Sequence, residues 1–270
     1  MALSIQYHVL PPGSLAHAAA ELFTSTVESA VALRKRARVA VSGGSTPRSM
    51  FAALASPTLP YLARIPWESL ELFWVDERCV PPADPESNFK MTREALLDPL
   101  NQNLAALGRA FHPAQIHRIE AELPPAEAAA RYESELRNTF RLEGAETPRF
   151  DLIALGMGPD GHTASIFPAT EAIYNFTDLV TANPVPQHAT TRITLTWPVI
   201  NQASRVFFLI AGADKAATVR QVFTGPRNPD LFPAQLIRPA NGILTLLLDQ
   251  AAAAELPAAD AAGYGTLTRE

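Results

Sequence analysis

The sequence predicts a three-layer α/β/α protein with helices on both faces of a mostly parallel, Rossmann-like sheet. Short apolar segments of strand length alternate with helical segments along most of the chain, which is the order that a parallel sheet with crossover helices requires. Several strands are apolar on both faces, as in residues 206–211, and this is typical of a sheet covered on both sides. A strand, a glycine-rich turn and a helix also follow one another directly at residues 38–55 and 150–168.

The individual elements follow from hydrophobic periodicity. Apolar residues at the spacing of one helix face predict helices, and short apolar runs between turn residues predict strands. The predicted helices are residues 15–33, a helix from the glycine turn to about residue 55, and 88–100, 126–142 and 214–223. The predicted strands are residues 38–42, 70–75, 115–119, 150–155, 179–182, 192–197, 206–211 and 243–248. The alanine-rich stretch 251–262 is expected to form a short helix and a frayed end.

Length and composition limit the possible classes of protein. A chain of 270 residues with 47% hydrophobic and 18% charged residues can form one α/β domain, which we expect to span residues 1–270. The net charge of −5 argues against a nucleic-acid partner, which requires a basic face. An anionic small molecule would need local positive charges.

The cysteine count, the first residues and the length of the apolar runs indicate the cellular location and exclude one kind of metal site. Cys79 is the only cysteine, so neither an internal disulfide nor a cysteine-based zinc site can form. The first residues lack the features of a signal peptide, and the apolar runs are too short to span a bilayer. The expectation is a cytoplasmic protein without a membrane partner.

The turn Ser42-Gly-Gly-Ser-Thr-Pro47 lies between a predicted strand and a predicted helix. Glycines allow the backbone to turn sharply, Ser45 or Thr46 can cap the helix, and Pro47 suits its first turn. The amides at the start of the helix then form an anion site, typically for phosphate. The same residues also suit a tight turn with no ligand, and the segment is not a Walker loop because Gly-Lys-Ser/Thr is absent.

Three consecutive charged residues, Asp76, Glu77 and Arg78, end the apolar strand that begins at residue 70. They are candidates for site chemistry, and a solvated strand end with a local ion pair is the alternative. Cys79 is a weaker candidate for a nucleophile, because no activating partner is indicated.

The segment Gly156-Met-Gly-Pro-Asp-Gly-His162 follows the buried strand 150–155. In an open α/β sheet, ligands bind outside the carboxyl ends of the strands, which is where this turn places His162 and Asp160. A histidine can act as a general base near neutral pH. A purely structural histidine in the loop is the alternative.

Two further cations lie beside predicted strand ends. Arg192 precedes Ile193-Thr-Leu-Thr196, and Lys215 lies in Gly212-Ala-Asp-Lys-Ala216. Each could supply the positive charge that a phosphate needs, and each could instead be a solvated surface residue.

Taken together, these segments resemble the glucosamine-6-phosphate isomerase/6-phosphogluconolactonase family, in particular its lactonases. The resemblance rests on the four motifs already quoted, on Trp74–Pro81 with Asp84-Pro-Glu-Ser-Asn88, and on their order along nearly the whole chain. It implies the fold of glucosamine-6-phosphate deaminases and ribose-5-phosphate isomerases. It also implies a metal-independent hydrolase, without a cofactor, that converts 6-phospho-D-glucono-1,5-lactone to 6-phospho-D-gluconate in the pentose phosphate pathway.

The resemblance also implies a role for each candidate residue. His162 is the general base that activates water, and Asp160 orients it or the substrate hydroxyls. Arg78 closes over the substrate or stabilises the oxyanion, and Asp76 binds sugar hydroxyls. The residues that hold the phosphate are Gly43, Gly44, Ser45, Thr46, Arg192 and Lys215. A monomer or weak homodimer is expected.

One departure and two alternatives accompany this interpretation. The lysine that the family usually carries before Arg192 is absent, and His188 cannot be assumed to replace it. An amino-sugar-phosphate deaminase/isomerase would need a glutamate where Phe167 stands. A sugar-phosphate-binding regulator without catalysis would be expected to lack His162 or to carry a DNA-binding module.

Overall fold

A central sheet of eight strands runs through the molecule, for which the computed structural model describes residues 3–11, 13–259 and 263–269. The strand order is β11-β1-β10-β9-β6-β2-β3-β5. Every neighbouring pair is parallel except β1 and β11, which are antiparallel. The strands are β1 (Leu3–Leu10), β2 (Ala37–Val41), β3 (Leu70–Trp74), β5 (Ile116–His117), β6 (Leu152–Leu155), β9 (Arg205–Ile210), β10 (Ile243–Asp249) and β11 (Tyr264–Arg269).

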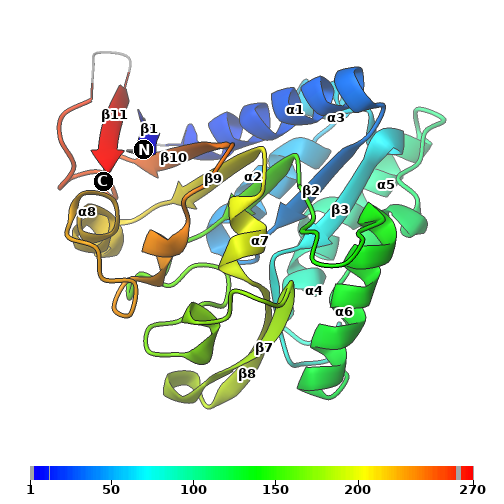
Figure 1. Cartoon of the computed structure of the whole chain (residues 1–270). Helices are drawn as coiled ribbons and strands as arrows, with labels where there is room; N and C mark the ends of the chain where they lie inside the picture. The colour runs from blue at the N-terminus through cyan, green and yellow to red at the C-terminus, as the bar shows by residue number, and fades with distance from the viewer. Residues whose placement is uncertain (1–2, 12, 260–262, 270) are drawn as a thin grey trace.

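Helices cover both faces of this sheet (Figure 1). The helix α1 lies along one face, and α6 and α8 lie on the other. The helices are α1 (Leu15–Arg34), α2 (Ser45–Ala55), α3 (Tyr61–Arg64), α4 (Asn88–Thr92), α5 (Asp98–Ala105), α6 (Pro125–Phe140), α7 (Trp197–Asn201) and α8 (Ala216–Thr224). The central strand β2 is buried along its whole length, as is β6, because both faces are covered. The prediction of a three-layer, mostly parallel α/β fold is therefore confirmed.

A second, antiparallel sheet of three strands extends from the main sheet. It has the order β4-β8-β7 and consists of β4 (Asp76–Arg78), β7 (Val180–Val185) and β8 (Thr190–Leu195). The amide of Leu195 donates to the carbonyl of Val75, directly after β3 (2.8 Å). The small sheet is thus attached at the carboxyl end of β3, beside the loop that follows β6.

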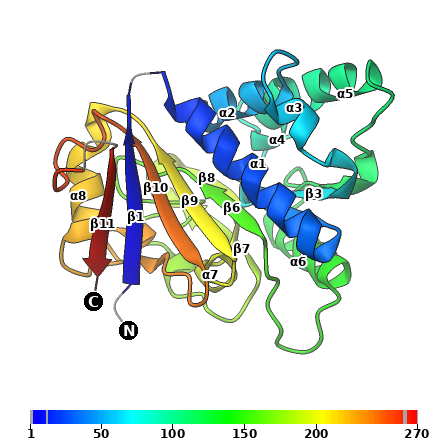
Figure 2. The same cartoon turned by 90° about the horizontal axis from the view of Figure 1, so that it is seen from above.

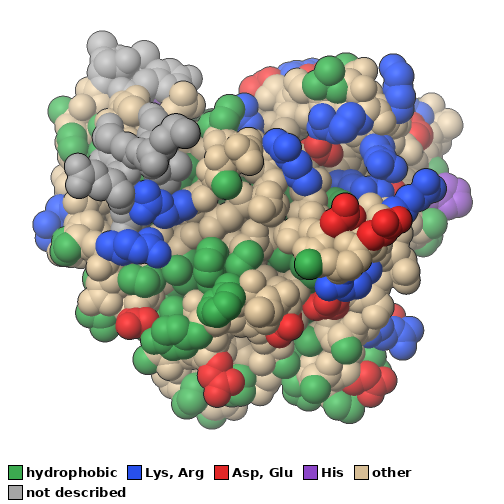
Figure 3. Space-filling view, viewed as in Figure 1, with side chains coloured by type: hydrophobic (Ala, Val, Ile, Leu, Met, Phe, Trp, Pro, Cys, Tyr) green, Lys and Arg blue, Asp and Glu red, His purple; other side chains and the backbone are tan. Residues whose placement is uncertain are grey.

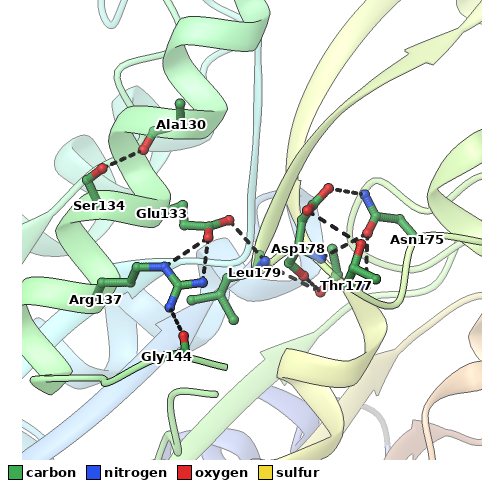
Figure 4. A network of polar contacts seen from close by, with 10 residues as sticks. Ala130, Glu133, Ser134, Arg137, Gly144, Asn175, Thr177, Asp178 and Leu179 are labelled. Atoms are coloured by element: carbon green, nitrogen blue, oxygen red, sulfur yellow. Dashed lines mark hydrogen bonds and ion pairs between the residues drawn. The ribbon is translucent and has the colours of Figure 1, made fainter. Parts of the chain in front are cut away.

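A polar network ties this small sheet to α6 (Figure 4). The Glu133 carboxylate accepts hydrogen bonds from the Arg137 guanidinium (2.8 Å) and from the amide of Leu179, just before β7 (3.1 Å). Arg137 also donates to the carbonyl of Gly144 (3.0 Å). One carboxylate therefore connects the helix, the loop after it and the start of β7.

Several predicted elements differ in the structure. The segments 179–182 and 192–197 fall in the small antiparallel sheet as parts of β7 and β8, and the predicted helix 88–100 is interrupted by a π-helical segment, Arg93–Leu97. The predicted C-terminal helix is wrong for residues 251–259, of which 251–255 form turns and 256–259 are irregular, while residues 260–262 lie outside the described part of the chain.

The two strands at the ends of the chain were not predicted. β1 and β11 pair with each other, and their alternation of apolar and polar residues is clear only when a partner is known.

Candidate active site

A cavity of about 300 Å³ opens at the carboxyl ends of β2, β6 and β9. This is the edge at which parallel α/β sheets bind ligands. Its walls come from the turn after β2, from β4 and the start of α4, from the loop after β6, and from the end of β9. The lining residues are Ser42, Gly43, Gly44, Ser45, Thr46, Pro47, Asp76, Arg78, Asn88, Gly156, Met157, Gly158, Pro159, His162, Ala164, Leu209, Ile210, Ala211 and Lys215.

The N-terminus of α2 forms one wall of this cavity. Gly44 is the N-cap residue with φ = +113°, a conformation that favours glycine, and no side chain caps the helix. The expectation that Ser45 or Thr46 caps the helix is therefore wrong, because both already lie in its first turn. The backbone amides of a first turn have no partner within the helix, so they and these two hydroxyls are available at an electropositive helix end.

Close packing explains the other glycine of this turn. A Cβ atom at Gly43 would lie 1.7 Å from the side-chain oxygen of Asn88. Asn88 in turn donates from Nδ2 to the carbonyl of Asp76 (2.8 Å). A side chain at residue 43 would therefore push the start of α4 away from the cavity.

A histidine and an aspartate are in direct contact in the loop after β6. Nδ1 of His162 and Oδ1 of Asp160 are 2.6 Å apart, and the backbone amide of His162 donates to the same oxygen (3.2 Å). Burial alone would raise the pKa of Asp160, but the hydrogen bond and charge of His162 outweigh it and leave this pKa below its ordinary value. The pair fixes the ring so that Nδ1 faces the carboxylate and Nε2 is the ring nitrogen on the other side.

Two neighbours determine where the His162 ring lies. The ring stacks on Phe167, with 4.0 Å between centroids and 23° between planes. A Cβ atom at Gly158 would lie 2.1 Å from Nδ1 of His162 and 2.5 Å from Oδ1 of Asp160. The absence of a side chain at Gly158 therefore leaves room for the histidine–aspartate pair.

The three charged residues after β3 have three different environments. Glu77 is buried and accepts hydrogen bonds from the amides of Arg78 (2.9 Å), Asn88 (2.7 Å) and Phe89 (2.8 Å). Burial raises its pKa, which these backbone donors oppose. Glu77 therefore holds the start of α4 and is a structural residue, a role that the sequence did not reveal.

Asp76 and Arg78 lie on either side of Glu77 and both line the cavity. One oxygen of Asp76 accepts a hydrogen bond from the hydroxyl of Ser165 (2.6 Å). The Arg78 guanidinium donates to the side-chain oxygen of Asn88 (2.5 Å) and to the carbonyl of Glu86 (2.7 Å). Neither contact is with a carboxylate, so these bonds orient the Arg78 cation without neutralising it.

The two remaining cations are placed differently. Lys215 lines the cavity on a largely buried side chain, and its ammonium forms an ion pair with the exposed Asp214 (3.0 Å). Arg192 does not line the cavity; it lies on β8 directly opposite Arg78. Burial and the charge of Arg78 lower the pKa of Arg192. Of the predicted site residues, all line the cavity except Arg192 and Asp160, and Asp160 is bonded to His162.

Two cavity residues were missed in the sequence. Ser42 is buried, lines the cavity, and its hydroxyl has no hydrogen-bond partner in the structure. Asn88 links the Arg78 guanidinium to the carbonyl of Asp76. The sequence Glu-Ser-Asn at residues 86–88 could have predicted the role of Asn88, because an asparagine at the start of a helix often hydrogen-bonds to backbone groups.

The structure gives no support for Cys79 as a nucleophile or for a metal site. Burial raises the pKa of the Cys79 thiol, which disfavours the thiolate that a nucleophile needs. Within residues 3–11, 13–259 and 263–269, no group of three or more His, Cys, Asp or Glu side chains could hold a metal ion. In the same ranges no helix is long and apolar enough to cross a membrane.

Fold and cavity together define an α/β protein with a polar cavity at the carboxyl ends of a mostly parallel sheet. The family model of glucosamine-6-phosphate isomerases/6-phosphogluconolactonase matches residues 11–246. The chain therefore belongs to this family.

Individual relatives agree with this assignment. A 6-phosphogluconolactonase of Nostoc sp. is 39% identical over 238 residues, covering 87% of this chain and 91% of that protein. One of Synechocystis sp. is 39% identical over 234 residues, covering 86% and 90%. The structure of 6-phosphogluconolactonase from Trypanosoma cruzi superimposes with a TM-score of 0.81 at 26% identity, covering 96% of this chain and 99% of that one. A monomeric glucosamine-6-phosphate deaminase, at 19% identity and a TM-score of 0.71, shares the fold.

Proposed function

We propose that this chain hydrolyses 6-phospho-D-glucono-1,5-lactone to 6-phospho-D-gluconate. Family membership and relatives named as 6-phosphogluconolactonases support this reaction. The observation that carries it is the His162–Asp160 pair at a cavity that the N-terminus of α2 also lines. A site of this kind has an anion-binding end and a proton-accepting end.

The phosphate of the substrate binds at the start of α2. The amides and hydroxyls of Ser45 and Thr46 lie in the first turn of this helix, and Lys215 adds a positive charge on the cavity wall. These groups suit a dianionic phosphate because helix N-termini and cations both favour negative charge. Gly43 and Gly44 allow the backbone to approach the phosphate closely, and Arg192 contributes its charge from behind Arg78.

His162 acts as the general base. With Nδ1–H donating to Asp160, Nε2 is the acceptor that takes a proton from a water molecule as its oxygen attacks C1 of the lactone. The bond between C1 and the ring oxygen then breaks, and the ring oxygen receives the proton as it becomes the C5 hydroxyl. The second proton of the water is released as the new carboxyl group ionises. Lactone and water are thereby converted to product with no oxidant, reductant or cofactor.

Arg78 and Asp76 serve the sugar end of the substrate. The Arg78 cation faces the cavity without a carboxylate partner, so it can stabilise the oxyanion that forms at the lactone carbonyl. Asp76 has one oxygen bonded to Ser165, which leaves the other to accept hydrogen bonds from substrate hydroxyls.

The proposal favours hydrolysis over amino-sugar isomerisation. Isomerisation moves a proton between two carbons and needs a second proton-carrying group beside the histidine. The group stacked on the His162 ring is Phe167, which cannot carry a proton. The proposed enzyme needs no metal and acts in the cytoplasm. It consists of a single domain spanning residues 1–270 and is a monomer or a weak homodimer.

The test compares two reactions of the purified full-length protein. Formation of 6-phosphogluconate from the lactone is measured with the spontaneous hydrolysis subtracted, and ammonia release is measured from glucosamine 6-phosphate. We expect rapid lactone hydrolysis and no ammonia release. Ammonia release as the dominant reaction would assign the chain to the isomerases, and binding without either turnover would make it a sugar-phosphate-binding regulator.

A further inference from the structure

A second hollow lies on the main sheet, on the face that carries α1. Figure 2 shows α1 crossing the sheet diagonally, with β11 and β1 lying to one side of it. The groove beside α1 has a volume of about 650 Å³, more than twice that of the cavity described above. Its lining residues are Gln6, Tyr7, His8, Ala18, Glu21, Leu22, Ser25, Arg205, Thr245, Leu247, Gly265 and Thr266.

The register of the strands brings polar side chains into one row of this groove. Gln6 is the partner of Thr245 on β10 and of Thr266 on β11. Paired residues on neighbouring strands share a face of the sheet, so these three side chains lie on the same side. An interior sheet face covered by a helix would be apolar here, as the opposite face is at Leu244 and Leu246.

Arg205 supplies a positive charge at one end of the groove. Arg205 is the first residue of β9. It lies two residues before Phe207, which pairs with Thr245 on β10, so its side chain is on the same face of the sheet as that of Thr245. No hydrogen bond or ion pair of this guanidinium occurs within the described residues 3–11, 13–259 and 263–269. Its pKa is lowered by burial, and no acidic group opposes that effect. A half-buried cation without a counter-ion is costly, which indicates a site for an anion.

Thr245 is an independent sign of a missing ligand. It is only 9% exposed, and its hydroxyl is buried without a hydrogen-bond partner in the structure. Buried hydroxyls are normally paired, so an unpaired one that lines a groove suggests a partner from outside the chain. Among the described residues that line the groove, the one carboxylate is Glu21, which is already held by both terminal nitrogens of Arg64 (2.7 and 2.9 Å), so its charge is compensated.

We propose that this groove is a second binding site, which takes a small molecule with an oxyanion, a carboxylate or a phosphate, at the Arg205 end. The polar row of Gln6, Thr245 and Thr266 binds hydroxyl or carbonyl groups of that molecule, and Leu22 and Leu247 contact its carbon skeleton. The site lies on strands β1, β10 and β11 and on the first residue of β9, whereas the first cavity lies at the far end of β9. It is therefore separate from the lactone site.

The test uses citrate and inorganic phosphate as probes of the two oxyanion types. Binding to the full-length protein is measured by calorimetry, and the site is located by hydrogen–deuterium exchange of peptides covering residues 3–11 and 243–249. We expect at least one probe to protect these peptides, and Arg205→Gln to weaken that binding about tenfold or more, in line with a charge-assisted hydrogen bond. A preference for citrate or for phosphate identifies the carboxylate or the phosphate as the ligand group.

Two further variants make the outcome decisive. Arg36→Gln removes an exposed cation that precedes β2 and should leave binding unchanged. Thr245→Val should weaken binding without lowering the stability of the free protein, because its hydroxyl has no partner to lose. Equal loss in Arg36→Gln, no loss in Arg205→Gln, or protection only around residues 42–47 and 156–162 would overturn the proposal. So would a dimer that dissociates in Arg205→Gln, since the groove would then be a subunit interface.

Discussion

Two histidine–carboxylate pairs have almost the same local geometry in different surroundings. Nδ1 of His162 is 2.6 Å from Asp160, and Nδ1 of His117 is 2.6 Å from Glu135. Each ring also stacks on a phenylalanine, with centroid separations of 4.0 Å and 4.3 Å. In the first pair the carboxylate is two residues away in the same loop, and in the second it is eighteen residues away on α6.

The difference lies in what each ring faces. His162 lines a cavity with the N-terminus of α2 and a lysine on its walls. His117 lies on the edge strand β5, and its Nε2 is buried without a partner. The neighbouring pocket of about 420 Å³ does contain Arg118 and Arg131, but each forms an ion pair with a glutamate. Beside the first pair, the start of α2 has no side-chain cap and the Arg78 guanidinium bonds to no carboxylate among the described residues, although Lys215 is paired with Asp214.

The same distinction between paired and unpaired cations applies to the rest of the surface. Although the net charge is −5, Figure 3 shows Lys and Arg side chains gathered over the upper right of one face. Many arginines of the chain are paired with carboxylates, as in the Arg64 and Arg109 ion pairs. A site is thus indicated by a cation that lacks a carboxylate partner, and much less by the number of cations.

The largest expected effect separates the two histidines. His162→Asn keeps a hydrogen-bond donor near Asp160 and removes the base, so kcat should fall about 10²- to 10⁴-fold. His117→Asn should leave kcat essentially unchanged and should lower the free energy of unfolding by about 1–3 kcal/mol. Steady-state kinetics and thermal unfolding of both variants check this. Comparable losses of kcat would show that the surroundings do not distinguish the pairs.

The next effect concerns the cations beside each pair. Lys215→Gln removes a charge from the cavity wall and should raise KM about 10- to 100-fold, the equivalent of a hydrogen bond to a charged group. Arg131→Gln removes a charge from the pocket beside His117, outside the first cavity, and should leave KM unchanged. The measurement is KM for the lactone in both variants. A Lys215→Gln protein with wild-type KM would remove this residue from the phosphate site.

A smaller effect is expected at the point where the two regions meet. Asn88 lines the first cavity and Phe89 lines the His117 pocket, and the Glu77 carboxylate accepts both of their amides. Glu77→Gln places an amide group against these donors and should cost about 1–3 kcal/mol of stability. Chemical denaturation measures this cost, and KM should rise because Arg78 loses its support through Asn88. A stable variant with unchanged KM would contradict the structural role of Glu77.

The smallest effect is on the pH dependence of stability. The pKa of Asp160 lies below its ordinary value of 3.8 because the hydrogen bond and charge of His162 outweigh the effect of burial. A lowered carboxyl pKa contributes stability above the unfolded-state pKa, and that stability is lost as the pH falls through the folded-state pKa. Asp160→Asn should therefore be destabilised at neutral pH by less than about 1 kcal/mol, since the pair is partly exposed.

The measurement is denaturation of wild type and Asp160→Asn at several pH values. The difference in unfolding free energy should shrink below about pH 4, the ordinary range of an aspartate pKa. Glu135→Gln serves as the matched variant in the other pair. A difference that grows toward acidic pH would have the wrong sign and would contradict the ion pair.

Local sequence patterns predicted the centre of the sheet well. β2, β3, β6, β9 and β10 are mostly apolar runs of strand length between turn residues, so the local pattern identifies them. The strand β1 and its partner, the edge strand β11, were missed because about half of their residues are polar. Their pairing joins residues more than 250 positions apart, a distance that no local pattern spans.

The candidate site was predicted to a similar extent. The turn at 42–47 and the loop at 156–162 were recognised because glycines, a histidine and an aspartate lie close in sequence. Glu77 was not separated from Asp76 and Arg78, because only the antiparallel pairing of β4 with β8 determines which way each side chain points. Ser42 and Asn88 were missed as ligand-facing residues for the same reason, since each depends on packing between distant segments.

The pairing of β1 with β11 has a practical consequence for anyone who handles this protein. Six residues near the C-terminus cover the outer edge of β1, which would otherwise present a row of free amides and carbonyls to other molecules. A C-terminal truncation before residue 263 is therefore expected to leave lactone turnover intact in freshly purified material and to promote aggregation on storage. For the same reason, an affinity tag is better attached through a flexible linker after residue 270 than in place of the final strand.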